Sequence, residues 1–490
     1  MKPIGAFLLA LGVLASTSIV AQTPFQRLDV VSGDFSDLLT DQTAVNGPEF
    51  GFSVAISGEW MAVGAPATVV SPEFGDRRGA IFMFRNQGDE WEQTQRIVMA
   101  GVGQDTRCGH SVALSGDYLV FGCPGRGSNS EKPENEAGST RIFKRNNDQE
   151  WVSHALFPSY PPAGATGNRC GTAVDIVTSS LPTSPFSVMA VSSCPGFDSG
   201  KGVVRVYAFD GNDWSLNPDI SASDGANGDS FGSALALTVS CDFVPPAGIT
   251  CLPRLAVGAP TKQHGNAILA GAVYVYAGYD FNETDIFTHE SPSTFGATLF
   301  GISVDINSSQ LLVGSSGAYT INCPNAPRCG RTLRWERDGS NWNSTVGGGA
   351  VNVGGTPPGE QVGMQFGRSV ALGFDNWIAI GAPQTDGGDA GFGGAYEGLG
   401  MVELRRNSNG DWGNSWGDSR GELRPDNFPF SLDYDDSQFG ASVAFGGQRW
   451  LAVGVPRLPQ LSFPGPVQVR HGQVWMYAQP DGIFNDRFEQ

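Results

Sequence analysis

The sequence predicts an all-β protein: a seven-bladed β-propeller of four-stranded antiparallel blades, with the ring closed by an N-terminal strand in the last blade. One strand-and-turn pattern returns seven times along the 490 residues. Each unit has roughly 60 residues, which suits one four-stranded blade. The last copy lacks a fourth strand, and a segment before the first copy resembles one. Because one small sheet cannot bury both of its faces, the units must stack.

The repeated unit contains four short segments with strand character. In the first copy an F-G dipeptide, Phe50-Gly51, leads into S-V-A, a second strand ends in G-A-P at Gly64, and a third begins at Gly79. Short β-branched and aromatic runs bounded by glycine favour strands joined by turns. The copies begin at Phe50, Cys108, Cys170, Phe231, Phe300, Phe366 and Phe439, and a fourth strand opens at Trp91, Trp151, Trp214, Trp342 and Trp412.

The ends of the repeat region predict how the ring closes. The seventh copy stops at Tyr477 and lacks a fourth strand that opens with tryptophan. Residues 25–31, before the first F-G, resemble the fourth strand around Gln95-Arg96-Ile97-Val98. We therefore expect the N-terminal segment to complete the last blade, which limits exposed sheet edges. A loose N-terminal tail is the alternative.

The N-terminus and the charge indicate an exported protein. Residues 1–21 resemble a signal peptide with a cleavage point at Ala21-Gln22, and an uncleaved anchor is the alternative. The net charge of −19, without a Lys/Arg cluster, argues against nucleic acid and anionic membranes as partners. We expect a monomer that is secreted, periplasmic or on the cell surface, with no membrane span after cleavage. The expected regions are 1–21 (signal peptide), 22–49 (N-terminal segment), 50–478 (repeats) and 479–490 (tail).

The eight cysteines suggest disulfides, because exported chains with an even number commonly form them. Cys108 replaces the Phe of F-G and Cys123 the Ala of G-A-P, and a two-residue turn at Ser115-Gly116 would place them opposite each other. The third copy makes the same double replacement. The expected pairs are Cys108–Cys123, Cys170–Cys194, Cys241–Cys251 and Cys323–Cys329. No spacing forms a paired C-x-x-C zinc site.

The succession F-G, S-V-A, G-A-P and V-Y-V-Y over residues 50–477 resembles the FG-GAP repeat family. That family includes the propeller of integrin α subunits and many secreted bacterial proteins, so the resemblance implies a propeller. Integrin-type blades often carry a calcium loop between the first two strands. Here Ser57-Gly58 and Ser115-Gly116 are tight turns without room for one. We therefore expect no cofactor and no metal; calcium binding would need a site without this loop motif.

Carboxylates and loops supply the candidate binding residues. Asp175 and Asp305 replace the Ala of S-V-A in the innermost strand, beside the central channel. There they would bind a cation or polar ligand, or accept backbone hydrogen bonds as buried carboxylates require. The long loops gather on one face, and loops on a rigid scaffold often carry function. Two acidic loop stretches add Asp386, Asp389, Tyr396, Glu397, Asp435 and Asp436.

These features favour a non-catalytic module that binds an extracellular glycan, matrix or protein ligand. Two alternatives stay open. An enzyme would need a convergent set of His, Asp, Glu, Arg or Lys side chains at the mouth of the channel. A purely structural cell-surface protein would bind no ligand.

Overall fold

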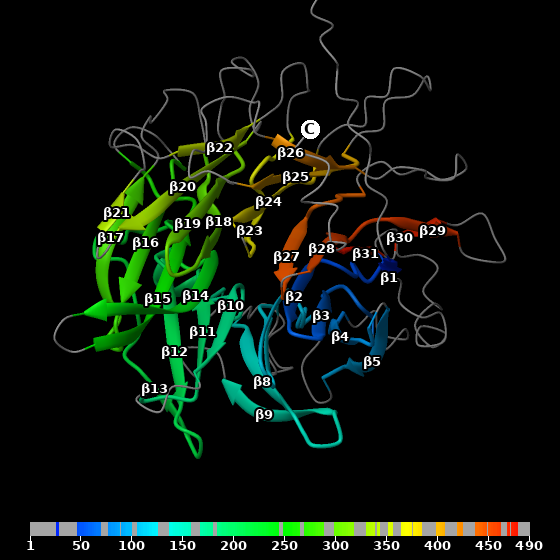
Figure 1. Ribbon diagram of the computed structural model, residues 1–490, viewed down its shortest axis with the longest axis horizontal. Helices are drawn as coiled ribbons and strands as arrows, with labels where there is room; N and C mark the ends of the chain where they lie inside the picture. The colour runs from blue at the N-terminus through cyan, green and yellow to red at the C-terminus, as the bar shows by residue number, and fades with distance from the viewer. Residues whose placement is uncertain are drawn as a thin grey trace, which may run out of the picture.

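The computed structural model describes residues 26–28, 47–69, 77–88, 90–99, 105–125, 137–157, 167–179, 184–244, 248–264, 269–288, 298–317, 330–338, 341–343, 351–355, 364–374, 376–384, 398–406, 419–424, 437–447, 449–461, 468–470 and 472–478. Within these ranges six four-stranded antiparallel sheets and one with a fifth strand surround a central axis (Figure 1). The predicted seven-bladed propeller is therefore confirmed. No helix in these ranges is long and apolar enough to cross a membrane.

The first four blades follow the chain in order from the axis outward. Blade 1 contains β2 (Ser53–Ser57), β3 (Trp60–Ala65), β4 (Ala80–Asn86) and β5 (Trp91–Ile97). Blade 2 contains β6 (Ser111–Ser115), β7 (Tyr118–Cys123), β8 (Ser139–Arg145) and β9 (Trp151–Phe157). Blade 3 contains β10 (Val174–Thr178), β11 (Val188–Cys194), β12 (Val203–Phe209) and β13 (Trp214–Leu216), with a short helical turn, α1 (Phe197–Gly200). Blade 4 contains β14 (Ala234–Val244), β15 (Gly248–Ala259), β16 (Ala272–Ala277) and β17 (Asn282–Thr288).

The last three blades vary the same plan. Blade 5 contains β18 (Phe300–Ile306), β19 (Gln310–Ser315), β20 (Arg331–Asp338) and β21 (Asn341–Asn343), and β22 (Val351–Gly355) also pairs with β20. Blade 6 contains β23 (Ser369–Leu372), β24 (Trp377–Ala382), β25 (Met401–Arg406) and β26 (Ser419–Leu423). Blade 7 contains β27 (Ser442–Gly446), β28 (Trp450–Val455), β31 (Gln473–Ala478) and β1 (Gln26–Leu28); β29 (Pro459–Leu461) and β30 (Gln468–Arg470) form a separate hairpin.

The ring closes through β1, which pairs antiparallel with β31 and places Gln26 opposite Met476. The Gln26 side chain accepts a hydrogen bond from the Trp91 N–H at 2.8 Å and donates to the Trp91 carbonyl at 3.1 Å. Gln95 makes the same two bonds with Trp151 in the next blade, at 2.8 and 2.9 Å. The N-terminal segment thus acts as the fourth strand of blade 7, as predicted.

Neighbouring blades are joined by the small residues of the repeat. The serine of S-V-A donates to the carbonyl of the F-G glycine in the following blade. The pairs are Ser53–Gly109, Ser111–Gly171, Ser303–Gly367, Ser369–Gly440 and, across the closing interface, Ser442–Gly51, at 2.8 to 2.9 Å. The glycine of G-A-P lies against the same carbonyl, so that a Cβ there would overlap it. The F-G and G-A-P signatures therefore mark one contact between blades.

Blade 3 solves this contact differently. Ala173, just before its first strand, stands where blades 1, 2, 5, 6 and 7 have serine, and its second strand has Ser193 in place of the G-A-P glycine. The Ser193 hydroxyl accepts from the Ala173 N–H at 3.0 Å and donates to the Ala173 carbonyl at 3.2 Å. In blade 3 the serine hydroxyl thus belongs to the second strand. It bonds to the first strand of the same blade, whereas the serine hydroxyls of the pairs named above bond to the next blade.

Three of the four expected disulfides are present: Cys108–Cys123, Cys170–Cys194 and Cys241–Cys251. Cys323 and Cys329 lie outside the described residues. The predicted turn was wrong by one residue, because Gly116-Asp117 joins β6 to β7 and Ser115 lies opposite Tyr118. Cys108 still reaches Cys123, since it precedes the regular ladder in a turn that the His110 N–H closes on the Arg107 carbonyl.

Candidate binding site at the channel mouth

The first strands of the blades surround the channel. β2, β6, β10, β14, β18, β23 and β27 contact one another in succession, and β27 contacts β2. Each begins at or shortly after an F-G or C-G dipeptide, so the residues beside this dipeptide lie at one mouth of the channel. The connections between blades and between second and third strands reach the same face. The mouth is therefore the place where the rigid ring meets the long loops.

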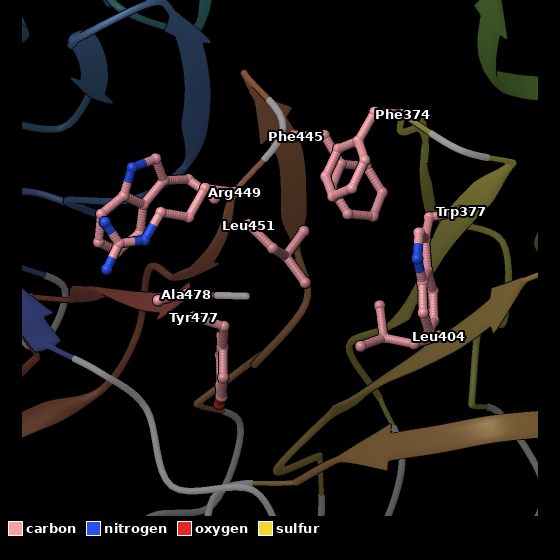
Figure 2. A pocket seen from close by; sticks show the side chains of 9 residues that line it. Phe374, Trp377, Leu404, Phe445, Arg449, Leu451, Tyr477 and Ala478 are labelled. Carbon is pink, nitrogen blue, oxygen red and sulfur yellow. The ribbon is translucent and has the colours of Figure 1, made fainter. Parts of the chain in front are cut away.

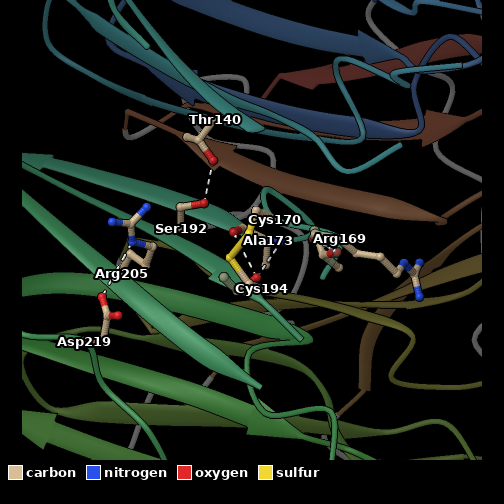
Figure 3. The surroundings of a disulfide bond; sticks show 10 residues. Thr140, Arg169, Cys170, Ala173, Ser192, Cys194, Arg205 and Asp219 are labelled. Carbon is tan, nitrogen blue, oxygen red and sulfur yellow. Dashed lines mark hydrogen bonds and ion pairs between the residues drawn. A yellow bond between two sulfur atoms is a disulfide. The ribbon is translucent and has the colours of Figure 1, made fainter. Parts of the chain in front are cut away.

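Arginines from two neighbouring blades flank this mouth. Arg107 and Arg169 directly precede the C-G dipeptides of blades 2 and 3, with φ of 55° and 54°. This left-handed conformation recurs at the same position in every blade, at Glu49, Arg107, Arg169, Ser230, Leu299, Gln365 and Gln438. Both arginines are exposed, and Figure 3 shows Arg169 extending away from the adjacent Cys170–Cys194 disulfide.

A third arginine reaches the same place from blade 6. Arg368 directly follows the F-G dipeptide, and its positive charge acts on His110 of blade 2 together with those of Arg107 and Arg169. Two blades separate blade 6 from blades 2 and 3 on either side, so this interaction crosses the mouth. Arg368 has an exposed surface, and desolvation of its charge lowers its pKa.

His110 reports the combined effect of these charges. Its ring lies 5.0 Å from that of Phe52, and its Nδ1 lies 3.2 Å from the Thr172 carbonyl oxygen, which requires the proton on Nδ1. Burial, followed by the positive charges of the arginines, lowers the pKa of His110 to about 4. The imidazole is therefore neutral at pH 7, and the positive charge of the mouth belongs to the arginines.

This arrangement suits recognition of an anion. Within the described ranges neither Arg107 nor Arg368 forms a salt bridge with a carboxylate. Guanidinium groups present several N–H donors in a fixed plane that matches carboxylates, sulfates and phosphates. The described part of the chain contains no group of three His, Cys, Asp or Glu residues that could hold a metal ion.

The two predicted channel carboxylates make backbone contacts between blades. Asp175 accepts from the N–H groups of Ile176 and, in blade 4, Leu237, at 2.8 and 2.6 Å. Asp305 accepts from Ile306 and, in blade 6, Leu372, at 2.8 and 2.7 Å. Burial raises the pKa of Asp175 to about 7 and that of Asp305 to about 6. These contacts match the hydrogen-bonding alternative; ligand binding by these carboxylates stays a prediction.

Replacing Asp175 with alanine should reduce the stabilisation of the protein at mildly acidic pH. The folded-state pKa is raised, so the folded protein holds this proton more tightly than the unfolded chain and gains stability as pH falls from 8 towards 4. Alanine occupies this position in the other blades without an Asp, as at Ala55. On going from pH 8 to pH 5, the Tm of the wild-type protein should therefore change in favour of the folded state by more than the Tm of the variant. An identical pH response in both proteins would contradict this.

The other predicted site residues are not placed by the structure. Asp386, Asp389, Tyr396, Glu397, Asp435 and Asp436 all lie outside the described residues. Sequence reasoning missed the three arginines, although a signal was present. They stand immediately before or after the F-G and C-G dipeptides, in repeat positions where the other copies have Glu, Ser, Leu, Gln, Phe, His, Thr, Ile or Ala.

Comparison with known proteins gives distant likenesses only. No family model and no curated protein sequence matches the chain. Similar solved structures include Sqt1 from Chaetomium thermophilum (12% identity, TM-score 0.42, covering 88% of each chain) and the periplasmic gluconolactonase PpgL of Pseudomonas aeruginosa (12%, 0.40, 76% of this chain and 85% of that one). A functionally unknown protein from Desulfotomaculum acetoxidans is also similar (11%, 0.36, 77% and 90%).

Proposed function

We propose that this protein is an extracellular binding module that captures an acidic group of its ligand at the channel mouth. The observation that carries the proposal is the position of Arg107, Arg169 and Arg368 beside the C-G and F-G dipeptides at the mouth, from which the charge of each lowers the pKa of His110. Positive charges around one mouth repel one another, and an anion bound there would relieve that repulsion. The resemblance to secreted FG-GAP repeat proteins supports the same class of function.

The net charge of the protein limits which kinds of anionic ligand can bind. A net charge of −19 repels long polyanions, whereas a local group of three arginines still attracts a compact anion. A short saccharide that carries one carboxylate or sulfate fits both conditions. An uronic-acid sugar is the simplest member of this class, with its ring outside the mouth and its carboxylate between the guanidinium groups.

Catalysis is the weaker alternative for this mouth. The charged groups that act on the His110 ring are three arginines, and the low pKa of His110 makes it a poor proton acceptor at pH 7. Glu49 is the one carboxylate at the repeat position of Arg107 and Arg169. A binding role needs no further group. An enzyme would need a nucleophile or a carboxylate base beside the bound anion.

The test is calorimetric titration of the mature protein with a glucuronic-acid disaccharide and with the matching neutral glucose disaccharide. We expect saturable binding of the acidic sugar only, weakened as salt is raised from 50 to 500 mM because salt screens exposed charges. Equal binding of both sugars, or no binding of the acidic one to the wild-type protein, would refute the proposal.

A further inference from the structure

Each blade closes a β-turn at the channel mouth. In every copy the residue before the F-G or C-G dipeptide accepts, through its carbonyl, a hydrogen bond from the N–H of the residue after the dipeptide, at 3.0 to 3.2 Å. The glycine of the dipeptide has a positive φ in each copy, as the third position of a type II turn requires. We call the two end residues of these turns the rim. All of them are partly or fully exposed, so their side chains are available to a ligand at the mouth.

The rim of blade 1 carries a phenylalanine that belongs to no apolar cluster of the described residues. Phe52 follows the F-G dipeptide and keeps part of its surface exposed. Phe50, two residues earlier, is fully buried among the side chains between blades 7 and 1. The other copies have His, Thr, Ser, Ile, Arg or Ala at the position of Phe52. The fold therefore does not require an aromatic ring there.

The Phe52 ring forms an aromatic pair with His110 on the rim of blade 2. Their ring centroids are 5.0 Å apart and their planes are inclined by 47°. The Thr172 carbonyl oxygen, 3.2 Å from Nδ1, holds the imidazole in place. Arg107 is the other end of the His110 turn, and the Cα atoms at the two ends of a β-turn lie within about 7 Å of each other. The aromatic pair therefore adjoins one of the three arginines.

Glu49, at the other end of the Phe52 turn, gives this part of the rim a direction. Its side chain is partly exposed and makes no hydrogen bond or ion pair with another described residue. An ionised carboxylate repels an anion and accepts hydrogen bonds from hydroxyl groups. A ligand with one acidic group and several hydroxyls would therefore direct its acid towards the arginines and its hydroxyls towards Glu49.

We propose, given the acidic saccharide of the function proposed above, that the sugar ring of this ligand stacks on Phe52. The C–H groups on one face of a sugar ring are apolar and pack against an aromatic face, which carries a partial negative charge. Ligand sites commonly combine such an apolar contact with a few polar groups that fix orientation. Phe52 thus holds the ring on the rim, and the carboxylate of the sugar extends from there to the arginines.

Calorimetric titration of the glucuronic-acid disaccharide into full-length mature variants tests the stacking. Phe52→Ala should bind it roughly 5- to 10-fold more weakly than the wild type, because the aromatic face is lost. Phe52→Trp keeps an aromatic face and should stay within about twofold of the wild-type affinity. Equal affinity of the wild type and Phe52→Ala would overturn the stacking, while capture of the acidic group would stand.

The neutral glucose disaccharide separates this proposal from the proposed function. If the wild type bound both sugars equally and Phe52→Ala weakened both, acid capture would be refuted and the stacking supported. No binding of either sugar by the wild type would overturn both. Proton NMR reports the stacking itself, because an aromatic ring shifts the C–H protons above its face upfield. We expect this shift in the sugar bound to the wild type and its loss in Phe52→Ala. A bound sugar without the shift in the wild type would overturn the stacking.

Phe374→Ala is the matched control. Phe374 follows β23 at the end away from the F-G dipeptide, is also partly exposed, and has its ring 6.4 Å from that of Phe445. Figure 2 shows both rings in a pocket between blades 6 and 7. This variant loses a phenyl ring on the opposite face and should bind the acidic disaccharide as the wild type does. A loss in Phe374→Ala equal to that in Phe52→Ala would overturn the proposal.

Discussion

The Gly381→Ala protein is expected to be less stable than the wild type by about 3 kcal/mol, because overpacking a close contact between rigid backbones forces both apart. Gly381 is the G-A-P glycine of blade 6. An added Cβ would overlap the carbonyl oxygen of Gly440 in blade 7 and the hydroxyl of Ser369. Ser369 donates to the same carbonyl at 2.8 Å, so the clash would also break the bond that joins the two blades.

Urea denaturation followed by circular dichroism measures this effect. Gly225→Ala is the control, because the nearest atom to its Cβ would be the Ala222 carbonyl oxygen at 3.3 Å. Ser369→Ala separates the two causes: it loses only the hydrogen bond and should cost about 1 kcal/mol. If Gly381→Ala were no more destabilising than Gly225→Ala, the close contact between blades would not limit this position.

The Arg368→Gln protein should lose most of its affinity for an acidic disaccharide. A hydrogen bond to a charged group contributes about 1.5–3 kcal/mol, which corresponds to a loss of roughly 10- to 100-fold in affinity. Arg368 supplies the only charge that reaches the mouth from the far side of the ring among the three arginines that act on His110. Its removal would leave a bound anion with arginines on one side of the mouth only.

Two further variants test the geometry. Arg368→Lys keeps the charge but loses the planar pair of donors, so it should fall between wild type and Arg368→Gln. Arg85→Gln removes an arginine that pairs with Glu59 at 3.2 Å in blade 1, and it should leave binding unchanged. Similar losses from Arg85→Gln and Arg368→Gln would mean that overall charge, rather than this mouth, attracts the ligand.

Much of the fold could be predicted because each blade repeats the same local contacts. The F-G and G-A-P signatures, the four-strand order and the role of residues around Gln26 all depend on short-range patterns that recur. The disulfides Cys108–Cys123 and Cys170–Cys194 were predicted for the same reason, and Cys241–Cys251 from its place across a longer turn. The turn register was not, since a small turn at Gly109-His110 interrupts the ladder before β6, and strand alternation does not reveal such a turn.

The sequence alone could not predict that these arginines lie at one mouth of the channel. Arg107 and Arg368 are distant along the chain, and their charges act on the same imidazole only because the ring closes. Repeat alignment shows which positions flank the channel, but not which blades face each other across it.

The most direct test of the charged mouth is the pKa of His110, measured by NMR titration of the imidazole and assigned with His110→Gln. The structure predicts a pKa of about 4 in the free protein. The pKa of His110 should be higher in Arg368→Gln than in the wild-type protein. It should also rise when an acidic disaccharide binds to the wild-type protein. Each change reduces the positive potential at the imidazole ring. A pKa near the ordinary 6.5 that does not respond to Arg368→Gln would contradict the convergence of the three arginines.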